Sequence, residues 1–278
     1  MILVADSGST SVDWRIIGEH QVVKVVSPGI NPVYQEPLEI QSIVLKALGT
    51  YCEEVSQVWF YGAGILSQEH VTKMNSTLQV LFPKASVMVG SDLLGAAVAL
   101  FGREKGMVAI LGTGSNSGLY DGEKIVSNVR AGGFILGDEG SGANIGKRLL
   151  SDYIKGMIPE ELSRKLEEKY YLDYPTIVEN VYRGTLPSRY LAQFTYFVKE
   201  HEEDSYIGKL LDSAFSDFYL RNILQYNGYR QLELGLVGSV AVVFKDAICR
   251  CGEKYGVRVS HVDKSAADGL AAFYGLAK

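Results

Sequence analysis

The feature that most constrains the fold is a pattern that occurs twice along the chain. An apolar run at residues 1–5 stops at Asp-Ser-Gly-Ser-Thr (6–10), and a second run at 106–111 stops at Gly-Thr-Gly-Ser-Asn (112–116). Further apolar stretches separated by turn residues follow each run, which predicts a three-stranded antiparallel meander in both places. We therefore expect an α/β protein of two similar halves, each built on a meander, with a cleft between them.

The two halves define the expected domains. A chain of 278 residues has the length of two ordinary domains. The boundary is predicted near 103–106, giving a first domain at 1–104 and a second at 105–278. The second is enlarged by a helical insertion at about 143–227, and the last helix is expected to pack back on the first domain.

Hydrophobic periodicity predicts the remaining elements. Helices are expected at 38–52, 67–81, 91–100, 143–155, 160–170, 187–200, 206–226, 240–252 and 265–277, and further strands at 58–61, 85–89, 232–237 and 257–259. The segment 132–142 contains five glycines. Because glycine is costly inside regular structure, neither helix nor strand is expected there.

Composition excludes several classes of protein. Lys and Arg number 27 against 32 Asp and Glu, a net charge of −5, and no long basic run occurs, which argues against a nucleic-acid or anionic-membrane binder. Three cysteines (Cys52, Cys249 and Cys251) and four scattered histidines indicate neither a disulfide framework nor a zinc site. We expect no signal peptide, no membrane span and a cytoplasmic setting.

The two turn strings are the first candidates for chemistry. Backbone N–H groups in a Gly/Ser/Thr turn form a concave site for phosphate oxygens, and Asp6 at a strand end is suited to hold Mg²⁺ through water. Each turn alone is equally compatible with a plain hairpin in which Asp and Ser cap backbone groups. Two such turns facing one cleft favour a polyphosphate. Neither string is the Gly-Lys-Ser/Thr motif of a P-loop.

Three further segments place small or acidic residues at strand ends. Asp92 begins a predicted helix, so it is either an N-cap or a general base, and the residues alone favour the cap. Asp138 and Glu139 lie in the glycine-rich segment 132–142, which is either a place of close approach to a ligand or a mobile surface loop. Gly238-Ser239 either admits a base or an anion to a helix start, or allows close helix–strand packing.

With these segments in order, the chain resembles the sugar kinase/Hsp70/actin ATPase superfamily, and within it the BadF/BadG/BcrA/BcrD-type branch that includes N-acetylglucosamine kinases. The most specific part of the resemblance is Gly-Thr-Gly-Ser-Asn at 112–116 followed by Gly-Asp-Glu-Gly-Ser-Gly at 137–142. The resemblance implies two ribonuclease H-like (actin-like ATPase) domains and an ATP- and Mg²⁺-dependent kinase for an amino sugar.

The resemblance also implies roles for individual residues. Asp6 matches the residue that helps hold Mg²⁺. Asp92 matches the catalytic base, so the resemblance favours the general base over the N-cap at this position. The residues that match contacts to ATP are Ser7, Gly8, Ser9, Thr10, Gly112, Thr113, Gly114, Ser115, Gly238 and Ser239. The residues that match contacts to the sugar are Asn31, Gly62, Ala63, Gly64, Asp92, Gly133 and Asp138.

One position departs from the family pattern. Bacterial relatives often carry Lys directly after the first motif's Thr, where this chain has Ser11. A cation there could offset charge in the transition state, so its absence affects the expected rate rather than the reaction type.

The expected substrate is N-acetylglucosamine or N-acetylmuramic acid, which would place the enzyme in amino-sugar metabolism and cell-wall recycling. The expected partners are this small molecule and, by analogy with relatives, a second copy of the chain. Two alternatives stay open: an ATPase activator of a CoA-ester dehydratase or reductase, which Cys249 and Cys251 suggest, and a sugar-sensing relative with weak catalysis.

Overall fold

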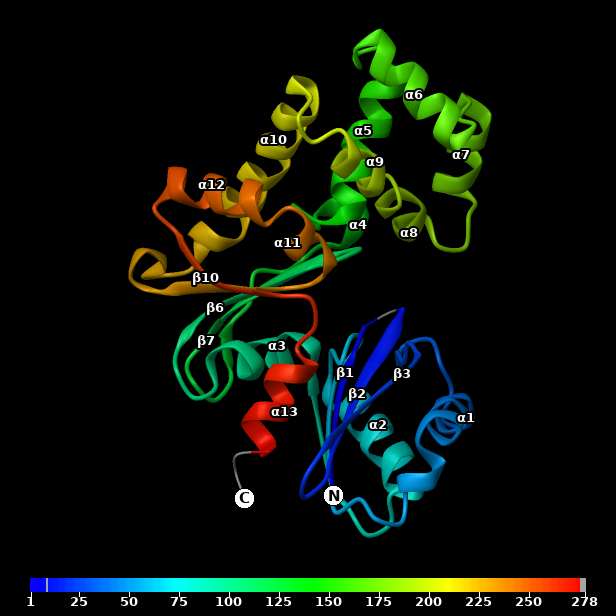
Figure 1. Ribbon diagram of the computed structural model, residues 1–278, viewed down its shortest axis with the longest axis vertical. Coiled ribbons are helices and arrows are strands. Elements are labelled where there is room, and N and C mark those ends of the chain that lie inside the picture. Colours follow the sequence, from blue (N-terminus) through cyan, green and yellow to red (C-terminus); the bar gives the residue numbers. More distant parts are fainter. Residues whose placement is uncertain (9, 276–278) are drawn as a thin grey trace. The chain divides into compact units, whose positions relative to one another are not determined.

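The computed structural model describes residues 1–8 and 10–275, and these form two compact units (Figure 1). Unit 1 comprises Met1–Gly106, the hairpin tip Tyr120–Val126 and the C-terminal segment from Ser265; unit 2 comprises Met107–Leu119 and Ser127–Lys264. The predicted phosphate contact of Ser9 and the end of the predicted last helix lie outside the described residues. Among the described residues, no helix combines the length and apolarity needed to cross a bilayer.

Unit 1 is built on a five-stranded mixed sheet in the order β3-β2-β1-β4-β5. Its strands are β1 (Ile2–Ser7), β2 (Ser11–Ile17), β3 (Val22–Pro28), β4 (Gln57–Gly62) and β5 (Ser86–Ser91), and its helices are α1 (Pro37–Leu48), α2 (Gln68–Leu81), α3 (Asp92–Phe101) and α13 (Ala267–Gly275). The antiparallel meander β1-β2-β3 is confirmed. The run of Ile2 to Ala5 is fully buried, as expected for a central strand with parallel and antiparallel neighbours.

The register of the parallel strands brings three chain segments to one edge. Ser7 at the end of β1 pairs with Gly62 at the end of β4, and Gly62 pairs with Ser91 at the end of β5. Because the carboxyl ends of parallel strands lie together, the segments that follow these three residues share this edge of the sheet.

Unit 2 is built mainly on the second sheet, in the order β10-β9-β6-β7-β8. Its strands are β6 (Gly106–Leu111), β7 (Ser115–Tyr120), β8 (Ile125–Ser127), β9 (Glu233–Val237) and β10 (Arg258–Asp263). Its helices are α4 (Gly133–Leu136), α5 (Gly142–Ile154), α6 (Glu160–Tyr170), α7 (Tyr174–Tyr182), α8 (Pro187–Ala192), α9 (Thr195–Glu200), α10 (Ser205–Arg221), α11 (Ser239–Val243) and α12 (Lys245–Tyr255). The second strand–turn–strand pattern is therefore confirmed as β6, β7 and β8.

The expectation of no regular structure at 132–142 is wrong, because α4 forms there. Gly132 (φ 76°) and Gly133 (φ 71°) adopt left-handed backbone at its start, and Gly137 closes it with an N–H bond of 2.8 Å to the Gly133 carbonyl. The Nζ atom of Lys147 donates to the Phe134 carbonyl at 2.8 Å. The glycines thus lie at the helix ends, where their conformational freedom is used.

Two predicted helices are each divided in two. The predicted helix 187–200 forms α8 and α9, and the predicted helix 240–252 forms α11 and α12. The side chains of Phe194 and Phe244 at the two breaks are fully buried. The free energy gained by burying these rings outweighs that of continuing each helix without a break. At the first break the Thr195 hydroxyl donates to the Ala192 carbonyl at 2.7 Å. Helix α7 was not predicted, and α10 ends before the predicted limit at 226.

The cap of α3 is Ser91, whose Oγ atom accepts a hydrogen bond from the Leu94 N–H at 3.2 Å. Asp92 is the first helical residue and accepts from the adjacent Leu93 N–H at 2.8 Å. We expect Ser91→Ala to lower the free energy of unfolding by about 1 kcal/mol, because one backbone donor loses its partner. Urea denaturation would measure this, and Asp92→Ala is expected to cost less. A larger loss for Asp92→Ala would identify Asp92 as the cap instead.

Candidate functional site

Asp6 and Asp92 place two carboxylates at the edge where β1 and β5 end. Asp6 is the penultimate residue of β1, and Asp92 directly follows β5. Both side chains are half-buried, and the negative charge of Asp6 acts on Asp92. This is the arrangement in which one carboxylate raises the proton affinity of another.

The carboxylate of Asp6 is fixed by the start of the C-terminal segment. Its Oδ2 atom accepts the Ser265 hydroxyl at 2.7 Å and the Ala266 N–H at 2.8 Å. These two donors lie far from Asp6 in the sequence and give the carboxylate a defined orientation. The second oxygen, Oδ1, has no hydrogen-bond partner among the described residues, so it can accept a bound water or a ligand.

The two carboxylates have raised pKa values. Burial is the main cause that raises the pKa of Asp92 to about 6; the Leu93 N–H opposes the rise and the charge of Asp6 adds to it. Burial also raises the pKa of Asp6, against the donors from Ser265 and Ala266. A carboxylate with a pKa near 6 is a better proton acceptor than an ordinary Asp and is still ionised at neutral pH.

Asn31 and the segment Gly62–Gly64 contact each other beside this edge. The Oδ1 atom of Asn31 accepts the Val33 N–H at 3.0 Å, which sets the orientation of the amide. Gly64 has a φ of 80°, and a Cβ atom on it would lie 2.1 Å from Asn31 Oδ1, so only glycine fits there. Ala63 is held by its N–H bond of 2.8 Å to the Ser7 carbonyl. The structure thus brings together three segments that the resemblance assigned to sugar and phosphate.

In unit 2, the turn Gly112–Ser115 is hydrogen-bonded to the first residues of α5. The Gly142 N–H donates to the Gly112 carbonyl at 2.8 Å, and the Ala143 N–H donates to the Thr113 carbonyl at 3.0 Å. The turn itself is closed by a 3.0 Å bond from the Gly112 N–H to the Gly114 carbonyl. The two most specific strings of the sequence therefore form one connected structure.

Asp138 lies against this turn. It is a buried carboxylate with a φ of 53°, a left-handed conformation that is unusual for a residue other than glycine. A Cβ atom on Gly114 would lie 2.9 Å from its Oδ2 atom. Burial raises the pKa of Asp138, while the Ser115 N–H and the charge of Lys147 oppose that rise. Backbone strain at a buried carboxylate is typical of a functional position.

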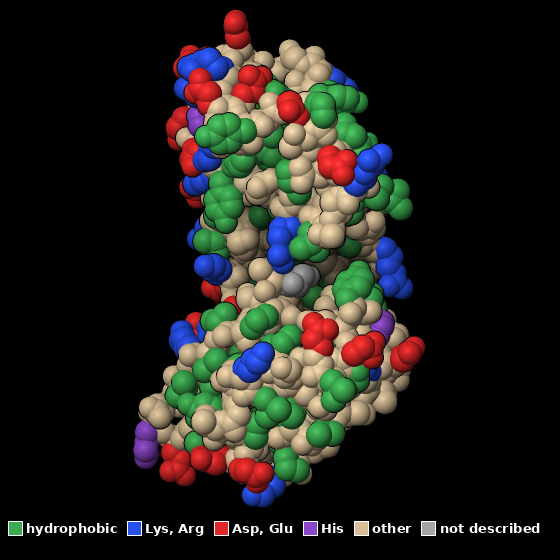
Figure 2. All heavy atoms as spheres, turned by 90° about the vertical axis from the view of Figure 1, so that its right-hand side faces the viewer, with side chains coloured by type: hydrophobic (Ala, Val, Ile, Leu, Met, Phe, Trp, Pro, Cys, Tyr) green, Lys and Arg blue, Asp and Glu red, His purple; other side chains and the backbone are tan. Residues whose placement is uncertain are grey.

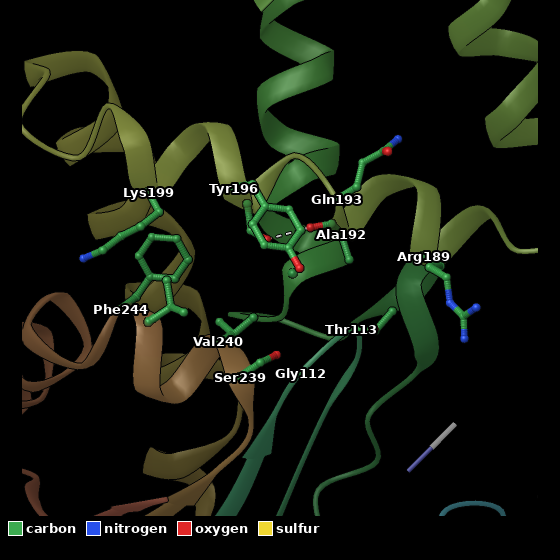
Figure 3. A pocket seen from close by; sticks show the side chains of 13 residues that line it. Gly112, Thr113, Arg189, Ala192, Gln193, Tyr196, Lys199, Ser239, Val240 and Phe244 are labelled. Carbon is green, nitrogen blue, oxygen red and sulfur yellow. Dashed lines mark hydrogen bonds between the residues drawn. The ribbon is translucent and has the colours of Figure 1, made fainter. Parts of the chain in front are cut away.

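A pocket of about 270 Å³ opens beside the same turn, entirely within unit 2 (Figure 3). It extends from Gly112 and Thr113 to Ser239 at the start of α11. The other lining residues are Gly142, Arg189, Ala192, Gln193, Thr195, Tyr196, Lys199, Val240, Val243 and Phe244. The rings of Tyr196 and Phe244 and the side chain of Val240 lie around its interior in Figure 3. Such a site, with a polar turn at one end and apolar walls, suits a flat base with attached phosphates.

Most of the pocket walls were missed by the sequence analysis. No local motif distinguishes the residues concerned, which lie in the predicted helices 187–200 and 240–252: Arg189, Gln193, Tyr196, Lys199 and Phe244. Gly238, in contrast, is not among the lining residues; its φ is 127°, and a Cβ atom on it would lie 2.2 Å from the Leu111 carbonyl oxygen. Gly238 therefore packs closely against the end of β6, and its contact to ATP stays a prediction. Gly133 has open space around its Cβ position.

A built-in metal centre is not found among the described residues, since no group of three or more His, Cys, Asp or Glu side chains could hold an ion. Asp6, with one oxygen unused, fits the looser mode in which Mg²⁺ keeps most of its waters and binds one carboxylate and substrate phosphates. Cys249 is half-buried and Cys251 is buried, both with free thiols. Charges of both signs are interspersed on the face shown in Figure 2.

Comparisons with known proteins identify solved structures of the same fold. A provisionally named N-acetylglucosamine kinase of Porphyromonas gingivalis is 38% identical, with 99% of each chain covered and a TM-score of 0.94. A provisionally named N-acetylglucosamine kinase of Chromobacterium violaceum is 16% identical over 98% of each chain, with a TM-score of 0.74. A ROK-family glucokinase of Streptomyces griseus, solved with glucose and AMPPNP, is 14% identical over 99% of this chain and 98% of that one, with a TM-score of 0.55.

The last two likenesses show the fold alone. The predicted fold class, α/β with the actin-like ATPase fold of sugar kinases, is confirmed. No protein-family model matches the chain, and no curated protein does. The narrower placement in the BadF-type branch therefore stays a prediction.

Proposed function

This chain belongs to the sugar-kinase family with the actin-like ATPase fold, and we propose that it transfers the γ-phosphoryl group of ATP to the 6-hydroxyl group of N-acetylglucosamine or the related N-acetylmuramic acid. The observation that carries the proposal is the half-buried carboxylate of Asp92, with a pKa of about 6, beside the second carboxylate of Asp6. The phosphate-type turn and its adjoining pocket in unit 2 support it independently.

In the proposed reaction the nucleotide binds to unit 2. Within the turn Gly112–Ser115, the N–H groups of Thr113 and Gly114 would hold phosphate oxygens, and the pocket lined by Tyr196, Val240 and Phe244 would take the base. The AMPPNP in the glucokinase structure supports ATP as the phosphoryl donor for a protein of this fold. On unit 1, the first turn from Ser7 to Thr10 is proposed to contact the transferred phosphoryl group.

Asp92 is the proposed general base. It would accept the proton of the sugar hydroxyl as that oxygen forms a bond to the γ-phosphorus and the bond to the β-phosphate oxygen breaks. Asn31, the segment Gly62–Gly64, Gly133 and Asp138 are the proposed sugar contacts, which would hold the ring so that the hydroxyl is in line. Asp6 would hold Mg²⁺ through water, and the ion would supply charge stabilisation at the phosphates.

The raised pKa of Asp92 gives an expected pH dependence. Only ionised Asp92 can accept the proton, so kcat/KM for the sugar should fall about tenfold for each pH unit below about 6. An ordinary Asp would keep full activity to about pH 4. The measurement is a pH profile of kcat/KM with a buffer series of constant ionic strength. An acidic limb near pH 4 would show that the group that must be ionised does not have the raised pKa of Asp92.

The proposed function is tested by measuring ADP release with a panel of sugars: N-acetylglucosamine, N-acetylmuramic acid, glucosamine and glucose. Substrates are confirmed by mass spectrometry of the sugar phosphate, which separates phosphoryl transfer from ATP hydrolysis. We expect turnover with at least one N-acetylated sugar and weaker turnover with glucose. ATP hydrolysis that no sugar stimulates, or phosphorylation of glucose alone, would contradict the proposal.

A further inference from the structure

Glu139 is a buried carboxylate that has no part in the proposed reaction. It follows the strained residue Asp138, and its side chain is directed to the end of α10. The Arg221 Nε atom lies 3.1 Å from Oε1, and the Asn222 Nδ2 atom donates to Oε2 at 3.3 Å. The Glu139 side chain is only 9% exposed, whereas that of Arg221 is 63% exposed. The carboxylate therefore has a partner on each oxygen, and both partners come from the same helix end.

This position is electrostatically unfavourable for an acid without those partners. The carbonyl end of a helix carries partial negative charge, which repels a carboxylate. Asp138, the adjacent residue, is a second buried acid. An apolar side chain could fill the same volume without these costs, since a buried ion pair contributes little net stability. The stability of the fold alone therefore does not account for a carboxylate at position 139.

The loop Gly137–Gly142 is held from two sides. In addition to the Glu139 contacts, Gly140 lies close to α10: a Cβ atom on Gly140 would be 2.9 Å from the Phe218 Cβ atom. At its other end the loop donates to the Gly112 carbonyl through Gly142. Asp138 directly precedes Glu139; its N–H donates to the Ala131 carbonyl at 2.9 Å and its carbonyl accepts the Ser141 N–H at 3.1 Å. Its carboxylate can therefore shift with the loop if the side held by α10 is released.

We propose that Glu139 is a positioning residue that, through Arg221 and Asn222, holds the Asp138 carboxylate in the geometry required to bind the sugar. The proposal rests on the proposed function, because it assigns the Asp138 carboxylate to the sugar. It predicts that releasing Glu139 from α10 weakens sugar binding more than it slows turnover, while nucleotide binding to the pocket is retained.

The test compares Glu139→Gln and Arg221→Met with Arg221→Lys. Glu139→Gln keeps the shape of the side chain and removes its charge. Arg221→Met removes the cation from a largely exposed position, so Arg221→Met folds even if Glu139→Gln does not. For both we expect the sugar KM to rise about five- to tenfold, with a smaller change in kcat. Arg221→Lys, which keeps the cation, should restore a near-normal KM. ADP affinity, measured by calorimetry, should stay within about twofold.

Lys254→Met is the matched control, because it removes an exposed ion pair of 3.0 Å between α12 and Asp212 on the same helix α10. It should leave the sugar KM unchanged. Hydrogen exchange of the Asp138 and Ser141 amides gives a second readout that needs no turnover: it should be faster in Glu139→Gln and Arg221→Met only. Unchanged exchange, or an unchanged sugar KM in an active enzyme, would overturn the proposal. Absence of sugar phosphorylation by the wild-type protein would instead refute the proposed function.

Discussion

Asp92→Asn is expected to lower kcat for sugar phosphorylation by roughly 10²–10⁴-fold, the usual contribution of a general base. The amide of Asn has the shape of the carboxylate but cannot accept the hydroxyl proton. Its Oδ1 atom can still accept the Leu93 N–H, a bond that is 2.8 Å long in the wild-type protein, so the start of α3 should stay intact. ADP affinity should be unchanged, because the proposed nucleotide pocket lies within unit 2. Steady-state kinetics and calorimetry with ADP measure the two effects.

Asp173→Asn provides a matched control for this substitution. Asp173 is a true helix cap, accepting the Thr176 N–H at 2.7 Å at the start of α7, and it lies outside the proposed site. Its replacement should leave both kcat and ADP affinity unchanged. If Asp92→Asn kept turnover within about threefold of the wild-type value, a proton acceptor at this position would be unnecessary and the assigned base would be wrong.

Gly112→Val should strongly weaken the binding of ADP without unfolding the protein. No atom lies within 4 Å of a Cβ placed on Gly112, and the residue lines the pocket at the phosphate turn, so an added side chain finds free space where phosphate oxygens would approach. Losing one or two charge-assisted hydrogen bonds should raise the ADP dissociation constant roughly 100-fold. The melting temperature should change by no more than about 3 °C. Calorimetry and thermal denaturation separate the two quantities.

Gly208→Val is the matched control, since Gly208 on α10 also has no atom within 4 Å of its Cβ position but is not among the pocket residues. It should bind ADP normally. Gly114→Ala should behave differently, because its Cβ atom would lie 2.9 Å from Asp138 Oδ2 and displace that carboxylate. Normal ADP affinity in Gly112→Val would show that the nucleotide does not use this turn.

The meanders and strand ends were predictable from the sequence because they depend on local patterns. Apolar runs and short turn strings specify β1 to β3 and β6 to β8. The ends of β1, β4 and β5 lie together because parallel strands pair in register. The sequence does not predict α4, because glycine lowers helix stability and five glycines lie in this segment. In the structure, Gly132 and Gly133 lie at the start of the helix, where this cost is small. Sequence patterns likewise could not show that Phe194 and Phe244 interrupt helices to enter the core.

By itself, the sequence determined the two turn strings, the acidic residues at positions 6, 92 and 138, and the fold class that their order implies. Only the tertiary structure decided which distant side chains surround them. The pocket walls of α8, α9 and α11, the Ser265 and Ala266 donors to Asp6, and the contacts of Glu139 with α10 all join segments far apart in the chain. The physical reason is that hydrogen bonds and packing between such segments depend on how whole helices pack on a sheet. That packing is set by the summed burial of many side chains and leaves no local signal at the residues concerned.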